Sequence, residues 1–349
     1  MKHYQGPGYA SFRYIHILAV LMLFTACNIV PSPEKISVRN LTSEFIYEEA
    51  PFPQCHASTL TETKEGLLAA WFGGTHEKNP DVCIYVSAKR NGRWSIPRLA
   101  ADGIINDTLR YPCWNPVLFT RENGEVILYY KIGPNPREWW GVYKISGDNG
   151  ESWSEETMIP DSLLGPIKNK PVRLADGSLL YPTSKETPAL WEIYVETSDQ
   201  DLTDWKKIKI DNNGFNPIQP TVLFHQNGRI QMLCRSKEKK IVETWSSDQG
   251  KSWTPVQATS LVNNNSGIDG VTLRSGLQLL VCNPVEKGRN RLGLFASADG
   301  KSWKEIMILE DQPEGEFSYP AILEGKDGTI HITYTWNRRK VKYVHLKIT

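Results

Sequence analysis

Short runs of apolar residues, separated by turn-forming residues, follow one another along most of this 349-residue chain. A unit made of one apolar run, a turn centred on glycine and a second apolar run occurs six times. Strand-length runs bounded by glycine are typical of β-strands joined by hairpins. The pattern therefore predicts an all-β chain. The six turn glycines are Gly66, Gly124, Gly177, Gly228, Gly276 and Gly328.

The six units also align at the start of their first apolar run. A repeat of about 50 residues that contains about four short strands predicts one blade of a β-propeller. We therefore expect residues 36–349 to form a single six-bladed propeller with four-stranded blades. The units open at His56, Asn115, Lys170, Gln219, Asp269 and Tyr319.

A tryptophan closes five of the units, and three of these tryptophans end a Ser-x-Asp-x-Gly-x-x-Trp motif. Ser146–Trp153 and Ser246–Trp253 fit it fully, and Ser297–Trp303 is one residue shorter. In such a turn the Ser and Asp side chains satisfy backbone amides, Gly takes a positive φ and Trp packs between strands. We interpret the motif as structural, with degenerate copies at Ser87–Trp94 and Ser198–Trp205.

The sixth unit lacks a fourth strand, because its tryptophan would fall near position 353, whereas the sequence ends at residue 349. The segment from Ile36 to Tyr47 precedes the first unit and has strand character. We expect this segment to complete the sixth blade and close the ring, which leaves no free sheet edge.

The first thirty residues have the pattern of a targeting segment. The apolar run Ile15–Phe24 follows the basic Lys2 and Arg13, as in a signal peptide. The next three residues, Thr25–Cys27, resemble a bacterial lipobox. We expect residues 1–27 to be a lipoprotein signal peptide, Cys27 to be lipidated and residues 28–35 to be a tether. The protein would then be anchored to a membrane of the bacterial cell envelope.

Charge and cysteine content exclude several classes of function. Lys and Arg number 40 and Asp and Glu number 39, so the formal net charge of +1 argues against a nucleic-acid partner. Besides Cys27 there are five cysteines and no CxxC pair. This favours buried thiols over a disulfide framework or a zinc site. We expect no metal and no cofactor.

The chemistry is expected where the six units open. The opening residues are all polar and all different, whereas the next position is proline in four units. In a propeller the first strands line the central channel, so these side chains would ring one mouth of it. The second strands should end at the same mouth, at Gly73, Lys131, Ser184, Arg235, Asn283 and Thr335.

Cationic residues are concentrated at this expected mouth, although the chain as a whole is nearly neutral. They favour an anionic ligand, and arginine suits a carboxylate. Trp139 and Trp140, in a neighbouring loop, are expected to be exposed and to stack on a sugar ring. The mouth is therefore predicted to bind an anionic carbohydrate. The cationic residues are Lys131, Lys170, Arg235 and Arg289.

The Asp-containing turns and the six-unit layout resemble the sialidase (neuraminidase) superfamily, in its BNR-repeat, neuraminidase-like branch, over about residues 48–349. The resemblance implies an Asp acid/base, a Tyr nucleophile activated by Glu, and three arginines that hold the sialate carboxylate. Asp81 matches the acid/base and Tyr319 the nucleophile. Arg235 and Arg289 match two of the arginines, with Arg291 as a substitute for Arg289.

Two positions depart from the family pattern. The first-blade arginine is missing, because Cys55–Ala57 stands in its place. The activating Glu should lie near Gln219, where no Glu occurs. A tyrosine needs a base or a nearby charge to attack as phenolate. Asp269 or Glu316 is then the candidate for that role.

The resemblance implies an exo-acting glycoside hydrolase that removes a terminal acidic sugar, either sialic acid or a related carboxylated sugar. Asp81 would protonate the leaving oxygen and Tyr319 would attack the anomeric carbon. The substrate-binding set would be Arg235, Arg289, Lys170, Gln219, Asn115 and Lys131.

Two alternatives stay open. In a polysaccharide lyase, His56 or Tyr319 would abstract the proton α to a uronate carboxylate, and Lys170, Arg235 and Asn115 would stabilise the enolate. The second alternative is a surface lipoprotein that binds glycans without catalysis. A lyase product gains an unsaturated bond that absorbs in the ultraviolet, which separates lyase from hydrolase.

Overall fold

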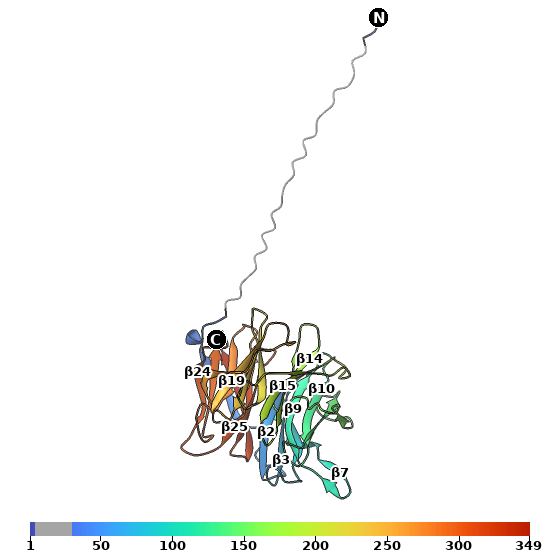
Figure 1. Ribbon diagram of the computed structural model, residues 1–349, viewed down its shortest axis with the longest axis vertical. Coiled ribbons are helices and arrows are strands. Elements are labelled where there is room, and N and C mark those ends of the chain that lie inside the picture. Colours follow the sequence, from blue (N-terminus) through green and yellow to red (C-terminus); the bar gives the residue numbers. More distant parts are fainter. Residues whose placement is uncertain (4–29) are drawn as a thin grey trace.

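The computed structural model describes residues 1–3 and 30–349, and it contains six antiparallel β-sheets that form the blades of a propeller (Figure 1). The all-β prediction and the six-bladed prediction are confirmed. The predicted lipidation site, Cys27, lies outside the described residues. In residues 30–349 the only helix is a 3₁₀ turn, η1 (Pro33–Lys35). No helix of the described residues is long and apolar enough to cross a membrane.

From its first to its third strand, each blade is built from strands that follow one another in the chain, from the axis outward. The innermost strands are β2 (Gln54–Thr63), β9 (Cys113–Thr120), β13 (Val172–Arg173), β17 (Pro217–Phe224), β21 (Asp269–Thr272) and β25 (Phe317–Glu324). The second strands are β3 (Gly66–Gly74), β10 (Val126–Ile132), β14 (Leu179–Glu186), β18 (Ile230–Ser236), β22 (Gln278–Cys282) and β26 (Ile330–Trp336).

The outer strands complete the blades. The third strands are β4 (Cys83–Arg90), β11 (Trp140–Ser146), β15 (Trp191–Ser198), β19 (Lys240–Ser246), β23 (Arg291–Ser297) and β27 (Lys340–Ile348). The outermost strands are β5 (Arg93–Trp94) and β6 (Arg98–Ala101) in the first blade, then β12 (Thr157–Met158), β16 (Lys206–Lys209), β20 (Gln257–Val262) and β24 (Lys304–Asp311). A separate hairpin, β7 (Ile104–Asn106) with β8 (Leu109–Arg110), lies between the first two blades in sequence.

The N-terminal strand closes the ring as predicted. β1 (Val38–Phe45) pairs antiparallel with β27 and becomes the fourth strand of the sixth blade. The pairing continues past the strand ends, because Ser37 and Thr349 exchange backbone hydrogen bonds of 2.8 and 3.0 Å. The first and last strands of the propeller therefore share one sheet.

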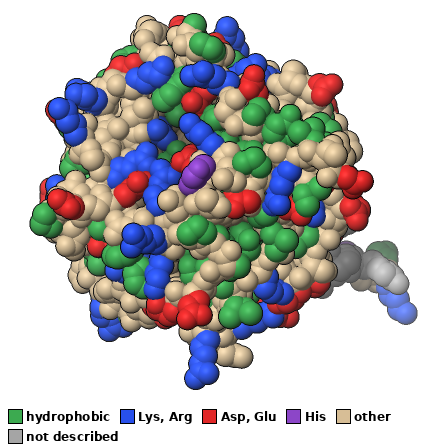
Figure 2. All heavy atoms as spheres, turned by 90° about the horizontal axis from the view of Figure 1, so that it is seen from below, with side chains coloured by type: hydrophobic (Ala, Val, Ile, Leu, Met, Phe, Trp, Pro, Cys, Tyr) green, Lys and Arg blue, Asp and Glu red, His purple; other side chains and the backbone are tan. Residues whose placement is uncertain are grey.

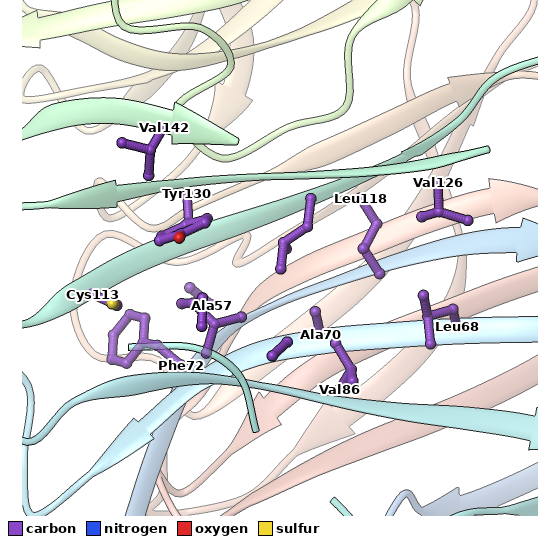
Figure 3. Close-up of a cluster of buried hydrophobic side chains, with 14 of the residues drawn as sticks. Ala57, Leu68, Ala70, Phe72, Val86, Cys113, Leu118, Val126, Tyr130 and Val142 are labelled. Atoms are coloured by element: carbon purple, nitrogen blue, oxygen red, sulfur yellow. The ribbon is translucent and has the colours of Figure 1, made fainter. Parts of the chain in front are cut away.

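Apolar side chains fill the space between neighbouring blades. Between the first two blades, Phe72 and Leu68 of β3 face Tyr130 of β10 and Leu118 of β9 (Figure 3). All four are at most 2% exposed. Five of the six cysteines fall within the described residues, and all five are buried and free, as expected.

The Asp-containing turns have the predicted hydrogen bonds. In the fourth blade, Ser246 Oγ donates to Asp248 Oδ1 at 2.8 Å and accepts from Gly250 N at 2.9 Å. Asp248 also accepts from the backbone N of Ser252 at 2.9 Å. Gly250 has a φ of +81°, and Trp253 donates from its indole to the Gly250 carbonyl. The side chains of the motif therefore stabilise a turn within a single blade.

The inner strands contain a bulge near the positions where the repeat was expected to open. Asn115, Gln219 and Tyr319 each have a positive φ, of 36°, 53° and 52°, and the strand register breaks after each preceding residue. In the first blade the equivalent residue is Ala57, with a φ of 57°, and not His56. The prediction that His56 opens the first unit was therefore wrong by one position, because the alignment did not include this bulge.

Candidate active site

The bulged inner strands aim their side chains at one face of the propeller, where the second strands end. A bulge changes the direction of a side chain, and strained φ values persist only where the surrounding structure holds them. Figure 2 shows this face, with Lys and Arg side chains gathered around a depression near its centre and acidic side chains among them. This face is the predicted mouth of the central channel.

Tyr319 lies at the centre of the site and accepts two hydrogen bonds at its phenol oxygen. Arg235 Nη1 donates to Tyr319 Oη at 2.8 Å, and Gln219 Nε2 donates to the same oxygen at 3.4 Å. Arg235 also donates to Gln219 Oε1 at 3.1 Å and to Asn265 Oδ1 at 2.8 Å. Two donors, one of them the Arg235 cation, contact this oxygen, which suits negative charge on it.

Two more arginines complete a cationic cluster, which we call the arginine cluster (Arg235, Arg289 and Arg338). The Arg289 guanidinium lies 5.6 Å from the centre of the Tyr319 ring, close to the 5.7 Å of Arg235. Glu316 accepts from Arg289 Nη1 at 2.8 Å and from Arg338 Nε at 2.6 Å. Burial alone would raise the pKa of Glu316, but Arg338 and Arg289 outweigh it and hold the pKa below its usual value. Glu316 therefore orients two arginines.

Arg338 is the functional candidate that sequence reasoning missed. It lies in the turn between β26 and β27, and its carbonyl accepts from the backbone N of Cys55 at 2.8 Å. Its guanidinium also donates to Glu77 Oε2 at 2.7 Å. A cation therefore lies beside the segment where the family's first-blade arginine is missing. Its only signal in the sequence is the basic run Arg338-Arg339-Lys340, which lies outside the aligned positions of the repeat.

His56 is buried against Tyr319 although it does not open the repeat. The two ring centroids are 4.1 Å apart, and His56 Nδ1 is 3.1 Å from Thr335 Oγ1. Burial, followed by the charges of Arg338 and Arg289, holds the pKa of His56 well below its usual value. The imidazole is therefore neutral at physiological pH.

Asp81 lies in the loop between β3 and β4, at the mouth end of the first blade. Its carboxylate accepts from Thr75 Oγ1 at 2.6 Å and from the Thr75 backbone N at 3.1 Å. The side chain is exposed. Asp81 thus stabilises its own loop, and its side chain stays open to solvent.

Asp269 makes its contacts inside the propeller. Its carboxylate accepts from Lys170 Nζ at 2.8 Å, from Thr221 Oγ1 at 2.9 Å and from the backbone N of Ile322 at 2.9 Å. Within residues 30–349, neither Asp269 nor Glu316 forms a hydrogen bond to Tyr319. Lys170 and Asp269 therefore connect blades near the axis of the propeller.

Three further expected positions lie away from solvent. Lys131 is fully buried and donates to the Pro166 carbonyl at 2.8 Å, and burial lowers its pKa to about 7. Asn115 is 5% exposed. Trp139 is also buried, edge-on against Trp114, which corrects the prediction that it is exposed. The tryptophan turned inward because the aromatic pair buries more apolar area than an exposed indole would.

Within the described part of the chain, no group of three or more His, Cys, Asp or Glu side chains is arranged to hold a metal ion. The arginine cluster has the chemistry to bind a carboxylate, with the Tyr319 oxygen beside it.

Comparison with known proteins gives the family and the fold. The model of the BNR repeat-like domain family matches residues 65–332, which is more than half of the chain. No curated protein matches the chain.

Solved structures with the same fold include several sialidases. The NanB sialidase from Streptococcus pneumoniae superposes with a TM-score of 0.71 at 14% identity, over 87% of this chain and 70% of that one. The sialidase of Trypanosoma rangeli gives 0.68 at 15% identity, over 89% and 59%. A protein of unknown function from Dyadobacter fermentans gives 0.73 at 15% identity, over 89% and 99%.

Proposed function

Since the chain belongs to the family of BNR repeat-like domains, we propose that it is a sialidase-type glycoside hydrolase that releases a terminal carboxylated sugar from glycans. The observation that carries the proposal is the arginine cluster around Tyr319, whose phenol oxygen accepts hydrogen bonds from Arg235 and Gln219. Guanidinium groups bind carboxylates through paired hydrogen bonds, so the cluster selects an acidic sugar.

The proposed reaction has two steps. In the first, Tyr319 Oη attacks the anomeric carbon and its proton passes to water, while the glycosidic bond breaks and Asp81 protonates the leaving oxygen. In the second, water attacks the anomeric carbon, Asp81 takes the proton of that water and Tyr319 is released. The configuration at the anomeric carbon is retained. Arg235 stabilises the charge that develops on the phenol oxygen.

A panel of glycans with different terminal acidic sugars tests this function. Released monosaccharides are identified by mass, and Tyr319→Phe serves as the inactive variant that keeps the ring. The expected result is release of one carboxylated monosaccharide by the wild type only. Binding without release by the wild type would make the protein a glycan-binding lipoprotein instead.

The contact between His56 and Tyr319 favours a lyase as the second candidate. The neutral imidazole, whose ring centroid lies 4.1 Å from that of the Tyr319 ring, would accept the proton, and the arginine cluster would hold a uronate carboxylate. Uronate-containing polysaccharides are the probe, and a rise in ultraviolet absorbance is the readout. If absorbance rises with the polysaccharide and no acidic sugar is released from sialosides, the protein is a lyase.

We also propose a lipid anchor at Cys27 and a location in the bacterial cell envelope. The support is the apolar run Ile15–Phe24 followed by Thr25–Cys27. Mass spectrometry of the N-terminal peptide from cells should find acylated Cys27, and Cys27→Ser should abolish the modification. An unmodified wild-type peptide would contradict the anchor.

A further inference from the structure

Three consecutive residues of the third blade extend their side chains to the inner strands of other blades. They are Lys168, Asn169 and Lys170, which we call the axial segment, and they lie just before β13. β13 has only two residues and is the shortest of the six inner strands. Lys168 and Asn169 are 4% and 1% exposed. The proposed reaction so far uses neither of these two buried polar side chains.

Lys168 links two backbone segments that surround Tyr319. Its Nζ donates to the carbonyl of Pro320, the residue after Tyr319, and to the carbonyl of Ile268 at 3.2 Å. A Cβ atom at Gly267, the residue before Ile268, would lie 3.2 Å from the Tyr319 ring, so the ring packs directly on that backbone. One amine therefore holds the strand that carries Tyr319 against the segment on which its ring rests.

The contact from Lys168 to the sixth blade supports a bulge. In β25, Tyr319 and Pro320 fall in the register break between Ser318 and Ala321, so neither has a register partner in β26. The third and sixth blades lie opposite each other in a ring of six, so the amine reaches across the channel. A bulge redirects a side chain, and a strained backbone persists only where its surroundings hold it.

Asn169 makes the equivalent contact to the fourth blade. Its Nδ2 donates to the carbonyls of Gln219 and Pro220 at 3.2 and 2.9 Å. These two residues fall in the register break of β17, as Tyr319 does in that of β25. The side chains of Gln219 and Tyr319 then meet beside Arg235. The axial segment therefore supports both bulges whose side chains meet at the phenol oxygen.

The place of Lys168 in the interior is costly for an amine. Burial lowers the pKa of Lys168 to about 7, and the charge of Asp269 opposes this shift. Its three acceptors are the two carbonyls and, at 2.9 Å, Asn169 Oδ1, which match the three donors of an ammonium group. An apolar side chain would avoid the cost of burying the amine, so we expect a lysine here only where its hydrogen bonds have a use.

From these contacts we propose that Lys168 and Asn169 are positioning residues of the reaction, which hold the bulges of β25 and β17 so that Tyr319 and Gln219 meet beside Arg235. The proposal rests on the proposed function and adds two residues of the third blade to it. Both residues act through the backbone that they hold, because they are buried and donate to carbonyls.

Kinetics with an aryl sialoside separate a positioning role from a purely structural one. Lys168→Met keeps an unbranched side chain and removes the donors. Its kcat should fall ~10-fold or more, because a reacting group displaced by about 1 Å can lose ~10²-fold in rate. Its KM should stay within about twofold, because within residues 30–349 Lys168 donates to none of the three arginines of the arginine cluster.

A second variant and a control accompany Lys168→Met. Asn169→Leu keeps a similar shape without the amide and should show the same loss of kcat at constant KM, so it decides the question if Lys168→Met does not fold. Thr183 is fully buried and donates to the Gly165 carbonyl at 3.0 Å. Thr183→Val removes this hydrogen bond, so it should lower the melting temperature and leave kcat unchanged. A folded Lys168→Met or Asn169→Leu with wild-type kcat, or with KM raised as much as kcat is lowered, would overturn the proposal.

Crystal structures separate this proposal from the proposed function. In Lys168→Met, the contact of 2.8 Å between Arg235 Nη1 and Tyr319 Oη should lengthen beyond hydrogen-bond distance. If that contact is lost and the wild type hydrolyses no sialoside, the hydrolase is wrong and the placement of Tyr319 by Lys168 stands. If the wild type hydrolyses sialosides and the contact is unchanged in the variant, the positioning role is wrong and the hydrolase stands.

Discussion

The hydrogen bonds of single side chains decide how Tyr319 can react. Its phenol oxygen accepts hydrogen bonds from Arg235 and Gln219, and within the described residues no carboxylate accepts a hydrogen bond from its hydroxyl. The amide of Gln219 has the shape of the glutamate that the family resemblance implies at this position. At this position the site therefore has a neutral group where the resemblance implies a carboxylate, and the first-blade arginine is missing as well.

Gln219→Glu should raise kcat of the proposed hydrolysis. The new carboxylate would accept the Tyr319 proton across the present 3.4 Å contact and keep its contact to Arg235. A positioned base contributes ~10²–10⁴-fold, so a gain of ~10-fold or more in kcat on an aryl sialoside is expected. Gln219→Leu removes the donor without adding a base and is the control. A fall of kcat in the folded Glu variant would show that the amide itself is needed.

Arg338→Lys should raise KM by ~10-fold for a substrate with a carboxylate and change kcat less. Lysine keeps the charge but loses the planar fork that contacts both Glu77 and Glu316. The neighbouring Arg339 is exposed, so Arg339→Lys is the matched control and should leave KM unchanged. If both variants keep the wild-type KM, the arginine cluster has only two members.

Asp81→Asn should lower turnover by ~10²–10⁴-fold if Asp81 is the general acid, because the amide keeps the shape and cannot transfer the proton. Steady-state rates are compared per folded molecule, with thermal unfolding measured alongside. Thr75→Val, which removes the 2.6 Å contact to Asp81, is the control for the loop. If Asp81 only stabilises its loop, both variants will lose stability and keep their activity.

The candidate site was predictable from the sequence where its residues belong to the repeat. Tyr319 opens a unit and Arg235 ends a second strand, so alignment of the six units found both. Arg338 belongs to a tight turn between the last two strands, and only the folded chain brings it beside Cys55. Asp269 was expected at the phenol because it opens a unit, but its register in β21 places it against Lys170.

At the scale of single elements, the turn motif was the most predictable feature, because its hydrogen bonds are local. Even the degenerate copy Ser198–Trp205 keeps the geometry: Asp199 accepts from the backbone N of Thr203 at 2.7 Å, and Trp205 donates to the Leu202 carbonyl. Leu202 takes the glycine position with a φ of 63°. The bulges in β2, β9, β17 and β25 were not predictable, since no glycine marks them: Ala57, Asn115, Gln219 and Tyr319 take the positive φ.

Asp248→Ala should destabilise the fourth blade by ~0.5–1.5 kcal/mol and leave activity per folded molecule unchanged, because the exposed turn amides exchange their carboxylate acceptor for water. Hydrogen bonds, above all those from Ser252, lower the pKa of Asp248 to about 2. The carboxylate therefore contributes stability above its unfolded pKa near 4, and this contribution is lost as the pH falls through 2. Urea unfolding should show a smaller difference between variant and wild type at pH 3 than at pH 7. If variant and wild type differ in unfolding free energy by the same amount at pH 3 and pH 7, the Asp248 carboxylate does not stabilise the turn through its charge.

At the scale of the whole molecule, closure depends on residues that precede the first blade. Closure by these residues was predictable from the sequence. The sixth unit has only three strands of its own, and the strand-like segment of residues 36–47 belongs to no unit. The segment of residues 159–171 that carries Lys168 to the axis was not predictable. It has no repeat counterpart, and the carbonyls of Ile268 and Pro320 come from two other blades.

Deleting residues 36–47 should open the ring. The loss of β1 uncovers the edge of β27, which offers its backbone groups to other chains. It also removes Ile46 and Tyr47, which are 3% and 7% exposed, and Tyr47 stacks on Trp71 at 5.2 Å. We expect a lower melting temperature and aggregates in size-exclusion chromatography. The control is Arg39→Ala/Ser43→Ala, which changes only exposed side chains of β1 and keeps its backbone pairing, so its melting temperature should stay close to that of the wild type. A deletion variant that stays monomeric and melts with the wild type would mean that β1 does not hold the propeller closed.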